Sequence, residues 1–246
     1  MDYREIAEKI AAAGLLLRGG FYPDPGDDAP AGTVTLLLVG NAGPDLWRAF
    51  LAATTAADRA TARHPLDQWT KRVLGGIAAG IGARVVFPFE GPPYPPFQRW
   101  ALRTGGVFPS PIGPLIDPTF GLWHAYRGAL LFGARLALPA APTHRSPCES
   151  CAEKPCLSTC PVGAFKASGP GDGGAVRYDV PACVGHVWSA QGHDCLEAGC
   201  RARRACPVGR DYIYRPEQAA FHMRKFLAAR WDKIAPADNP GGPRRA

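Results

Sequence analysis

Eight cysteines constrain this chain more than any other feature. All of them lie between Cys148 and Cys206, and residues 1–147 contain none. A disulfide framework that spans the whole chain is therefore excluded, and the sulfur chemistry belongs to one segment. The rest of the composition is that of a folded protein, because 46% of the 246 residues are hydrophobic and can bury a sizeable core.

The cysteines form two groups of four, and each group ends in Cys-Pro. The intervening residues number two, four and three in the group 148–160, and eleven, four and five in the group 183–206. Two such groups are typical of a bacterial ferredoxin module with two [4Fe–4S] clusters, in which the cysteine before proline ligates the other cluster. The predicted metal ligands are one crossed set of Cys148, Cys151, Cys156 and Cys206, and a second of Cys183, Cys195, Cys200 and Cys160.

Zinc and disulfides are the alternatives for these cysteines. Zinc ribbons need paired Cys-x2-Cys knuckles, and only Cys148 and Cys151 have that spacing. The intervals after Cys151, Cys183 and Cys200 exceed those of the compact bacterial module, which leaves open the pairing and the type of one cluster. Between the groups, Pro161–Phe165 (PVGAF) resembles the bacterial ferredoxin stretch. It is followed by a predicted turn at 169–174 and then by residues 175–180, which together predict a β-hairpin that returns the chain to Cys183.

Charge and hydropathy favour a cytoplasmic protein. No apolar run approaches the roughly 18–20 residues of a membrane span, and the acidic N-terminus does not resemble a signal peptide. The net charge is +7, and most of it lies in residues 141–246. This positive charge has three possible explanations: an ordinary solvated surface, arginines that offset anionic clusters, or a docking face for an acidic redox donor or acceptor protein. No basic run is interleaved with aromatics, so nucleic-acid binding is not expected.

Hydrophobic periodicity and turn residues predict an α+β or α/β arrangement in residues 1–140. We expect this domain to be followed by a two-cluster ferredoxin-type domain with a C-terminal helix over 141–234, and by a disordered tail over 235–246. Strands are predicted at 33–39, 84–89 and 129–132, and helices at 3–17, 44–53, 64–81, 96–103 and 215–231.

Two blocks of the N-terminal part resemble cobalamin-processing proteins of the cblC (MMACHC) type. The first is His64–Trp69 (HPLDQW) with Val85–Phe89 (VVFPF), and the second is Gly113–Trp123 (GPLIDPTFGLW) with Ala125–Leu131 (AYRGALL). The order of such a domain before two clusters is similar to epoxyqueuosine reductase and the reductive dehalogenases. The resemblance implies a nitroreductase-like α+β fold and a corrinoid ligand.

The resemblance implies a corrinoid-type pocket that includes Asp117, Trp123 and Arg127. The cblC pattern has histidine where this chain has Asp117, and no Asp-x-His-x-x-Gly motif is present. Any cobalamin would therefore be bound base-off, without a protein ligand to cobalt. Asp67, Trp69 and Arg72 fall at helical spacing, which favours capping or packing. An aromatic set suits either core packing or a wall for a flat macrocycle or flavin: Phe87, Phe89, Tyr94, Phe97 and Trp100.

Together these features predict an iron–sulfur electron-transfer protein or oxidoreductase that binds two [4Fe–4S] clusters and reduces a corrinoid held by its N-terminal domain. The alternative is a ferredoxin-like carrier whose N-terminal domain docks a redox partner and binds no cofactor. The sequence assigns no catalytic residue, and it leaves open whether the chain is an enzyme.

Overall fold

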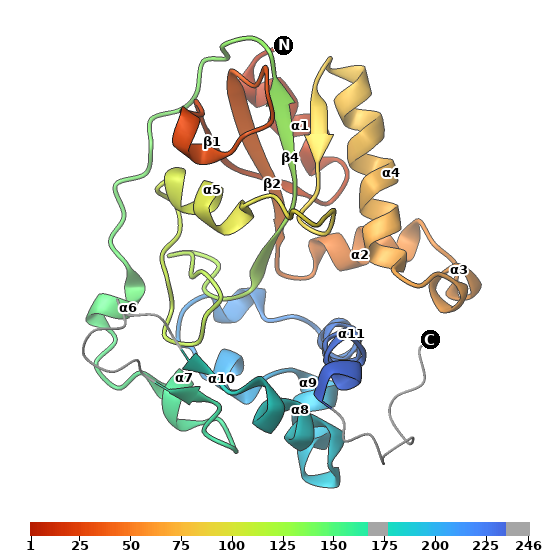
Figure 1. Cartoon of the computed structure of the whole chain (residues 1–246), viewed down its shortest axis with the longest axis vertical. Helices are drawn as coiled ribbons and strands as arrows, with labels where there is room; N and C mark the ends of the chain where they lie inside the picture. Colours follow the sequence, from red (N-terminus) through yellow and green to blue (C-terminus); the bar gives the residue numbers. More distant parts are fainter. Residues whose placement is uncertain (167–176, 235–246) are drawn as a thin grey trace. The chain divides into compact units, whose positions relative to one another are not determined.

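The computed structural model describes residues 1–166 and 177–234, with side chains described as far as Trp231 (Figure 1). The chain divides into two compact units. The first is Met1–Phe108 with Trp123–Arg145, and the second is Pro109–Leu122 with Ser146–Ala246. The segment Pro109–Leu122 thus joins the cysteine-containing unit. The predicted tail at 235–246 and the predicted turn at 169–174 lie outside the described residues.

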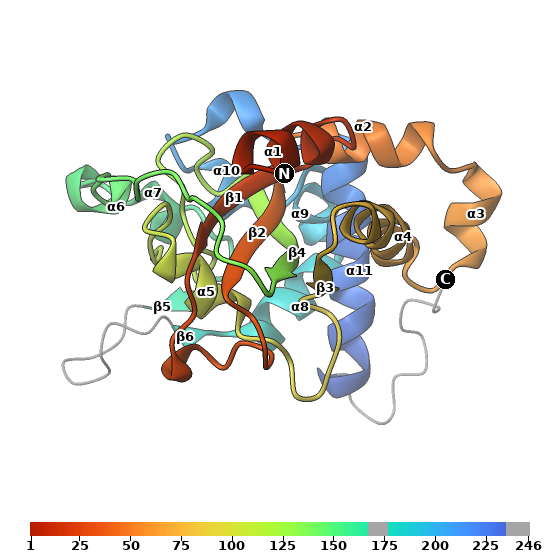
Figure 2. The same cartoon turned by 90° about the horizontal axis from the view of Figure 1, so that it is seen from above.

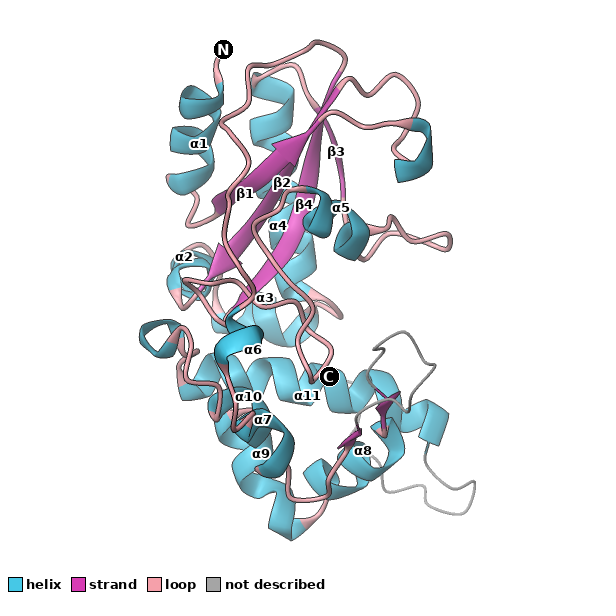
Figure 3. Ribbon diagram, turned by 90° about the vertical axis from the view of Figure 1, so that its left-hand side faces the viewer, coloured by secondary structure: helices cyan, strands magenta, loops and turns pink. Residues whose placement is uncertain are grey.

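The first unit is an α+β fold built on one antiparallel sheet, which confirms the predicted class. Its strands are hydrogen-bonded in the order β1-β2-β4-β3 (Figure 2). Helices α1 and α4 lie against one face of the sheet and α5 lies against the other (Figure 3). The strands are β1 (Leu16–Phe21), β2 (Thr35–Ala42), β3 (Arg84–Val86) and β4 (His124–Phe132). The helices are α1 (Tyr3–Ala11), α2 (Asp45–Ala52), α3 (Ala56–Thr61), α4 (Pro65–Gly80), α5 (Phe97–Arg103) and the 3-10 turn η1 (Pro25–Asp27).

Strand β2 is the centre of this unit. Every residue of its sequence TLLLVGNA is buried, because β1 and β4 pair with its two edges and helices cover its faces. A near-continuous apolar run is what such a strand requires. The strand predicted at 33–39 is therefore confirmed, and it continues to Ala42.

The first helix is shorter than predicted. A capping box formed by Asp2 and Glu5 begins α1, and Ile6 and Ile10 are its buried face. The helix ends at Ala11, and residues Leu16–Phe21 form the edge strand β1. The prediction of a helix to Leu17 is wrong because the apolar spacing continues into the strand.

The other predicted helices of the first unit are confirmed within a few residues. Helix α4 begins with Pro65 at its first position, where a missing N–H costs nothing. Helix α3 was not predicted. It is held by a capping box in which the Thr55 hydroxyl accepts the Asp58 N–H and the Asp58 carboxylate accepts the Thr55 N–H.

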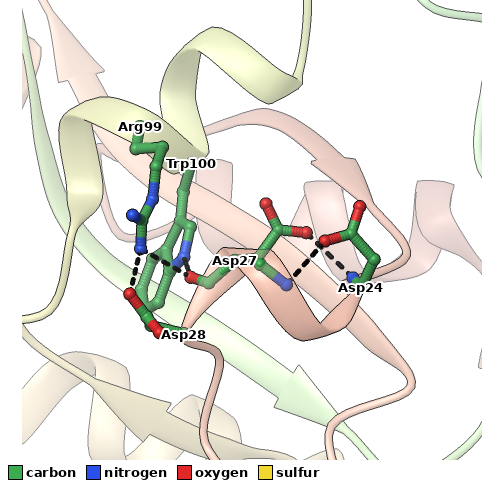
Figure 4. Close-up of polar contacts among 6 residues, drawn as sticks. Asp24, Asp27, Asp28, Arg99 and Trp100 are labelled. Carbon is green, nitrogen blue, oxygen red and sulfur yellow. Dashed lines mark hydrogen bonds and ion pairs between the residues drawn. The ribbon is translucent and has the colours of Figure 1, made fainter.

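A polar clamp joins the turn η1 to helix α5 (Figure 4). The Trp100 indole donates to the carbonyl oxygen of Asp27 at 2.7 Å, and Trp100 is fully buried. Arg99 donates to the carboxylate of Asp28 and to the same carbonyl. Arg103 lies 3.3 Å from the Asp27 carboxylate, which is itself buried. The clamp fixes the connection between β1 and β2 against α5.

The second unit is helical with one short hairpin. Strands β5 (Phe165–Lys166) and β6 (Arg177–Tyr178) pair antiparallel, as the predicted hairpin requires. The longest helix is α11, and it packs against α8 and α9. The helices are α6 (Pro147–Ser150), α7 (Pro155–Ser158), α8 (Val180–Trp188), α9 (His193–Ala198), α10 (Arg201–Arg204) and α11 (Pro216–Ile234), with 3-10 turns η2 (Ala190–Gly192) and η3 (Arg210–Tyr212).

None of the described helices has the length and apolar character needed to span a bilayer.

Candidate functional site

A β-bulge in β4 positions Arg127. Val39 of β2 pairs with Gly128, and the next residue, Gly40, pairs with Tyr126. Arg127 is therefore the extra residue of β4 at this point of the ladder. Bulges re-aim a side chain and are common beside functional sites.

Arg127 reaches from the sheet to helix α4. One terminal nitrogen donates to the Asp67 carboxylate at 2.8 Å and to the Thr70 hydroxyl at 3.1 Å. The guanidinium also lies 5.9 Å from the centre of the Phe89 ring. Its Nε atom is buried and has no hydrogen-bond partner among the described residues. Asp67 and Arg127 come from the two sequence blocks that resemble the cblC type, and this ion pair joins them.

An aromatic pair extends the site beyond Arg127. The rings of Phe87 and Phe89 stack with centroids 5.4 Å apart. Lys71 of α4 lies 5.8 Å from the centre of the Phe87 ring and forms an ion pair with Glu90 at 2.5 Å. The site therefore combines the partly exposed ring of Phe89, backed by the buried Phe87, with fixed charges of both signs. This combination suits a ligand with an apolar face and polar edges.

The other aromatic residues predicted either to pack or to contact a ligand are partly buried in the core and partly exposed. Phe97 and Trp100 are buried in α5, with ring centroids 5.1 Å apart, and form part of the core. Tyr94 is exposed. Phe97 and Trp100 thus take the packing role that the sequence left as one of two alternatives. Phe87 is also buried, at 4% exposed, and the partly exposed Phe89 lies beside Arg127.

The other two residues predicted for the corrinoid pocket have structural partners. Trp123 is only 2% exposed and belongs to the core of the first unit. Asp117 belongs to the second unit, where its carboxylate accepts the N–H groups of Thr119 and Phe120 at 2.7 and 2.9 Å. The structure thus places Asp117 in a turn and Trp123 in a core. Their role toward a ligand stays a prediction.

A second bulged arginine was not predicted from the sequence. The pairing of β1 with β2 shifts between Leu17 and Gly20, so β1 carries one extra residue there. Arg18 lies in this bulge, is 9% exposed, and faces the ring of Tyr126 at 6.0 Å. The Leu-Arg-Gly-Gly run around it is the sequence signal, because glycine next to a strand often marks a bulge.

In the second unit, four cysteines line one small pocket. The remaining lining is mainly proline and aliphatic side chains, such as Pro111, Ile116 and Val208, together with Lys154. Burial raises the pKa of the Cys148 and Cys156 thiols, and the neighbouring sulfur of Cys206 raises both pKa values further. The four cysteines are Cys148, Cys151, Cys156 and Cys206.

The other four cysteines are also electrostatic neighbours. Burial raises the pKa of Cys183 to about 11, and the sulfurs of Cys200, Cys160 and Cys195 add to the shift. The backbone N–H of Ala164 donates to the Cys160 sulfur at 3.3 Å. All eight cysteines are free thiols, so the disulfide alternative has no support here.

The arginines near these thiols have protein partners. Arg201 and Arg204 both pair with the carboxylate of Asp194, and they lower the pKa of that group. Arg203 donates to the carbonyl oxygen of Leu122 at 2.9 Å. Arg201 also interacts electrostatically with the Cys195 sulfur, and the Arg203 guanidinium lies 4.7 Å from the centre of the Tyr214 ring.

No group of three or more Cys, His, Asp or Glu side chains within residues 1–166 and 177–234 is arranged to hold a metal ion. The C-terminal ferredoxin-like domain, which was expected on the basis of metal ligands, is thus not shown. What the structure shows in this unit is a pair of thiol groupings between short helices.

Comparison with known proteins shows a likeness to a solved structure. No protein-family model and no curated protein matches the chain. Among solved structures, the chain is similar to the crystal structure of a C. elegans B12-trafficking protein, CblC, a homologue of human MMACHC. The TM-score is 0.53 and the identity 14%, over 95% of this chain and 94% of that chain. At this identity the likeness establishes the fold, and it supports the cblC-like part of the predicted resemblance.

The predicted electron-transfer function is wrong. It required two [4Fe–4S] clusters, and the described residues contain no group that could hold one. The fold is similar to that of a B12-trafficking protein over almost the whole chain, including the part predicted to be a separate ferredoxin module. The alternative of a ferredoxin-like carrier fails for the same reason.

Proposed function

We propose that this chain binds a corrinoid and acts in the handling of cobalamin. The observation that carries the proposal is the likeness of its fold to a B12-trafficking protein over 95% of its length. The two sequence blocks that resemble the cblC type add support, because Asp67 and Arg127 join them directly.

The residues around Arg127 fit such a ligand. The buried Nε of Arg127 has no hydrogen-bond partner among the described residues, and an unsatisfied buried donor is costly unless a ligand pairs with it. A corrinoid carries carbonyl oxygens at the edge of a flat ring, so Arg127 could donate to one of them. Phe89 offers an apolar face beside this donor. Asp67 would orient the guanidinium, since its carboxylate already accepts a hydrogen bond from a terminal nitrogen of Arg127.

When bound, a corrinoid supplies a cobalt ion that changes its oxidation state and upper ligand. The chain itself would bind the ring against Phe89 and hold the ring edge at Arg127. No residue is assigned as a cobalt ligand, in keeping with a base-off form.

Spectrophotometric titration tests this proposal. Adding the protein to hydroxocobalamin and to cob(II)alamin should shift the corrinoid absorption bands and saturate at one equivalent. The variant R127A should weaken binding by about tenfold or more, the cost of a lost charge-assisted hydrogen bond. R84A is the matched control, because Arg84 is exposed and bonds only to Ala31 and Thr33. An unchanged spectrum with both cobalamins would overturn the proposal.

We propose, as a second role, that the thiols of the second unit bind a thiophilic group. The small pocket lined by Cys148, Cys151, Cys156 and Cys206 favours this, because four soft donors face one apolar cavity. As the side chains stand they could not hold a metal ion, so binding would require the thiols to lose protons and close on the group. Cys160, Cys183, Cys195 and Cys200 are the second predicted set.

Elemental analysis of protein purified without oxygen tests this second role. The expected result is a thiophilic element bound at a fixed ratio and lost in C206S. The control C195S changes a thiol outside the small pocket and should retain the share bound there. Protein that carries no such element, and takes none up when reduced, would overturn this role without affecting the corrinoid titration.

A further inference from the structure

A cavity of about 280 Å³ lies in the first unit between the end of α2, α3 and the first turns of α4. Its volume is near the lower end of the range of small-molecule sites, roughly 300–1,000 Å³. Its lining comes from three consecutive elements. The lining residues are Ala53, Thr54, Asp58, Thr61, Ala62, Pro65, Gln68, Trp69 and Arg72.

The aromatic and threonine lining of this cavity is held in place. Trp69 is 4% exposed, and its ring meets the buried ring of Phe50 edge-on, with centroids 5.9 Å apart. Arg59 donates to the carbonyl and the hydroxyl of Thr54, at 2.5 and 3.0 Å, and so ties α3 to the end of α2. A cavity between tied elements loses little entropy when a ligand enters it.

The polar groups of the cavity differ in whether they are already engaged. The Asp58 carboxylate accepts hydrogen bonds from the N–H and the hydroxyl of Thr55, at 2.8 and 2.7 Å. These bonds lower the pKa of Asp58, and the nearby Arg72 contributes to the shift. The Thr61 hydroxyl donates to Ala57. The Asp58 carboxylate has no hydrogen to donate, and the Thr61 hydroxyl has already donated its own, so neither group can donate a hydrogen bond to an anionic ligand.

Arg72 and Gln68 are the uncommitted donors. They are four residues apart on α4, so their side chains leave the same face of the helix. Neither side chain makes a hydrogen bond to the part of the chain that the structure describes. A guanidinium presents paired N–H donors that match the two oxygens of a carboxylate or phosphate.

We propose that this cavity is a binding site for a small oxyanion, a carboxylate or phosphate group, held by Arg72 and Gln68 above Trp69. The site is separate from the residues around Arg127 and does not depend on the corrinoid proposal. The Asp58 carboxylate repels an anion, and this repulsion grows with the charge of the anion, so a singly charged oxyanion is the preferred ligand.

The test is an NMR titration of the full chain with inorganic phosphate and, separately, with acetate. Saturable shifts are expected in the amides of residues 66–72 and in the Trp69 indole N–H. R72A should weaken binding by about tenfold or more, and R72K, which keeps the charge without the fork, by less. Comparing the two anions identifies the preferred oxyanion.

The matched control is R48A, which removes an exposed arginine of α2 that pairs with Asp45 outside the cavity. If R48A and R72A weakened anion binding equally, or if sodium chloride caused the same chemical-shift changes, the effect would be general electrostatic screening. Either result would overturn the proposal. Circular dichroism establishes that each variant is folded. Cobalamin binding should be the same in R72A as in the unaltered chain, so this result is independent of the corrinoid titration.

Discussion

At the scale of the single residue, the buried hydrogen bond from Trp100 to the Asp27 carbonyl is a direct stability test. W100F removes the donor and leaves the carbonyl with only the longer bond from Arg99 at 3.3 Å. Losing a buried hydrogen bond of this kind costs about 1–3 kcal/mol. We expect the free energy of unfolding in urea to fall by that amount.

The matched comparison is R99A in the same clamp. Arg99 is about half exposed and its ion pair with Asp28 is on the surface, where such pairs contribute about 0–1 kcal/mol. R99A should therefore cost less than W100F. A larger loss in R99A would mean that the clamp is held by its surface charges.

Thiol reactivity provides a second residue-scale prediction. Burial raises the pKa of Cys183 to about 11 and also raises the pKa of Cys200. Only the thiolate is alkylated, so a raised pKa lowers the reactive fraction at any pH below it. In reduced, chelator-treated protein, iodoacetamide labelling of Cys183 should be slow at pH 7 and rise steadily toward pH 11, as read by mass spectrometry.

The same chain unfolded in urea is the control for this labelling. There the cysteines should label together with an ordinary thiol pKa of about 8.5. If Cys183 is the fastest of the eight cysteines to be labelled in the folded protein at pH 7, burial does not raise the pKa of its thiol.

The sequence could locate the candidate residues but not their partners. Arg127 was expected to be important from the family resemblance alone, and its contact with Asp67 spans 60 positions. The bulge that aims Arg127 depends on the register between β2 and β4, which no local pattern reveals. In contrast, the spacing of the cysteines correctly indicated a local cluster of sulfurs, although not a preformed metal site.

At the scale of the element, a glycine pair can either end a helix or lie within an irregular strand, and the sequence alone did not distinguish these two cases. Gly19-Gly20 closely follows the helix predicted at 3–17, as a helix stop would, but both residues belong to β1. Gly19 has a φ of +89°, and a Cβ on Gly20 would lie 2.4 Å from the Leu37 side chain. Long helices such as α4 were predictable because their apolar spacing and start signals agree. Helix α3 has no buried residue and so no periodic signal.

Two glycine substitutions test this difference between elements. At Gly40 of β2, a Cβ would lie 2.2 Å from the Ala125 carbonyl oxygen, so G40A should destabilise the first unit by about 1–3 kcal/mol through overpacking. At Gly76 of α4, a Cβ meets nothing within 4 Å. G76A should therefore stabilise by about 0.5–1 kcal/mol through helix propensity.

Thermal unfolding of the two variants is the measurement. The predictions have opposite signs, so they cannot both follow from a general effect of added methyl groups. A neutral result for G40A would show that β2 and β4 can separate at this point without cost.

At the scale of the whole molecule, the two compact units are not two consecutive stretches of sequence. Residues Pro109–Leu122 belong to the second unit although the chain on either side belongs to the first. Gly121 packs so closely on the second unit that a Cβ would lie 2.0 Å from the Val208 carbonyl oxygen. Arg203 donates from two nitrogens to the Leu122 carbonyl, at 2.9 and 2.5 Å. Composition could not predict that this segment belongs to the second unit, because it contains no cysteine and its residues are typical of a loop.

This path predicts the behaviour of a truncated chain that ends at Arg145. Such a chain keeps all four strands of the first sheet but removes every partner of Pro109–Leu122 in residues 146–246. The segment should then lose its order, because its buried contacts with Val208 and Arg203 are gone. Limited proteolysis should cut the truncated chain within 109–122 and leave that segment intact in the full chain. A full chain with R203A, which removes one anchor and keeps the rest, should show intermediate protection, whereas equal protection in all three would show that the first unit orders this segment by itself.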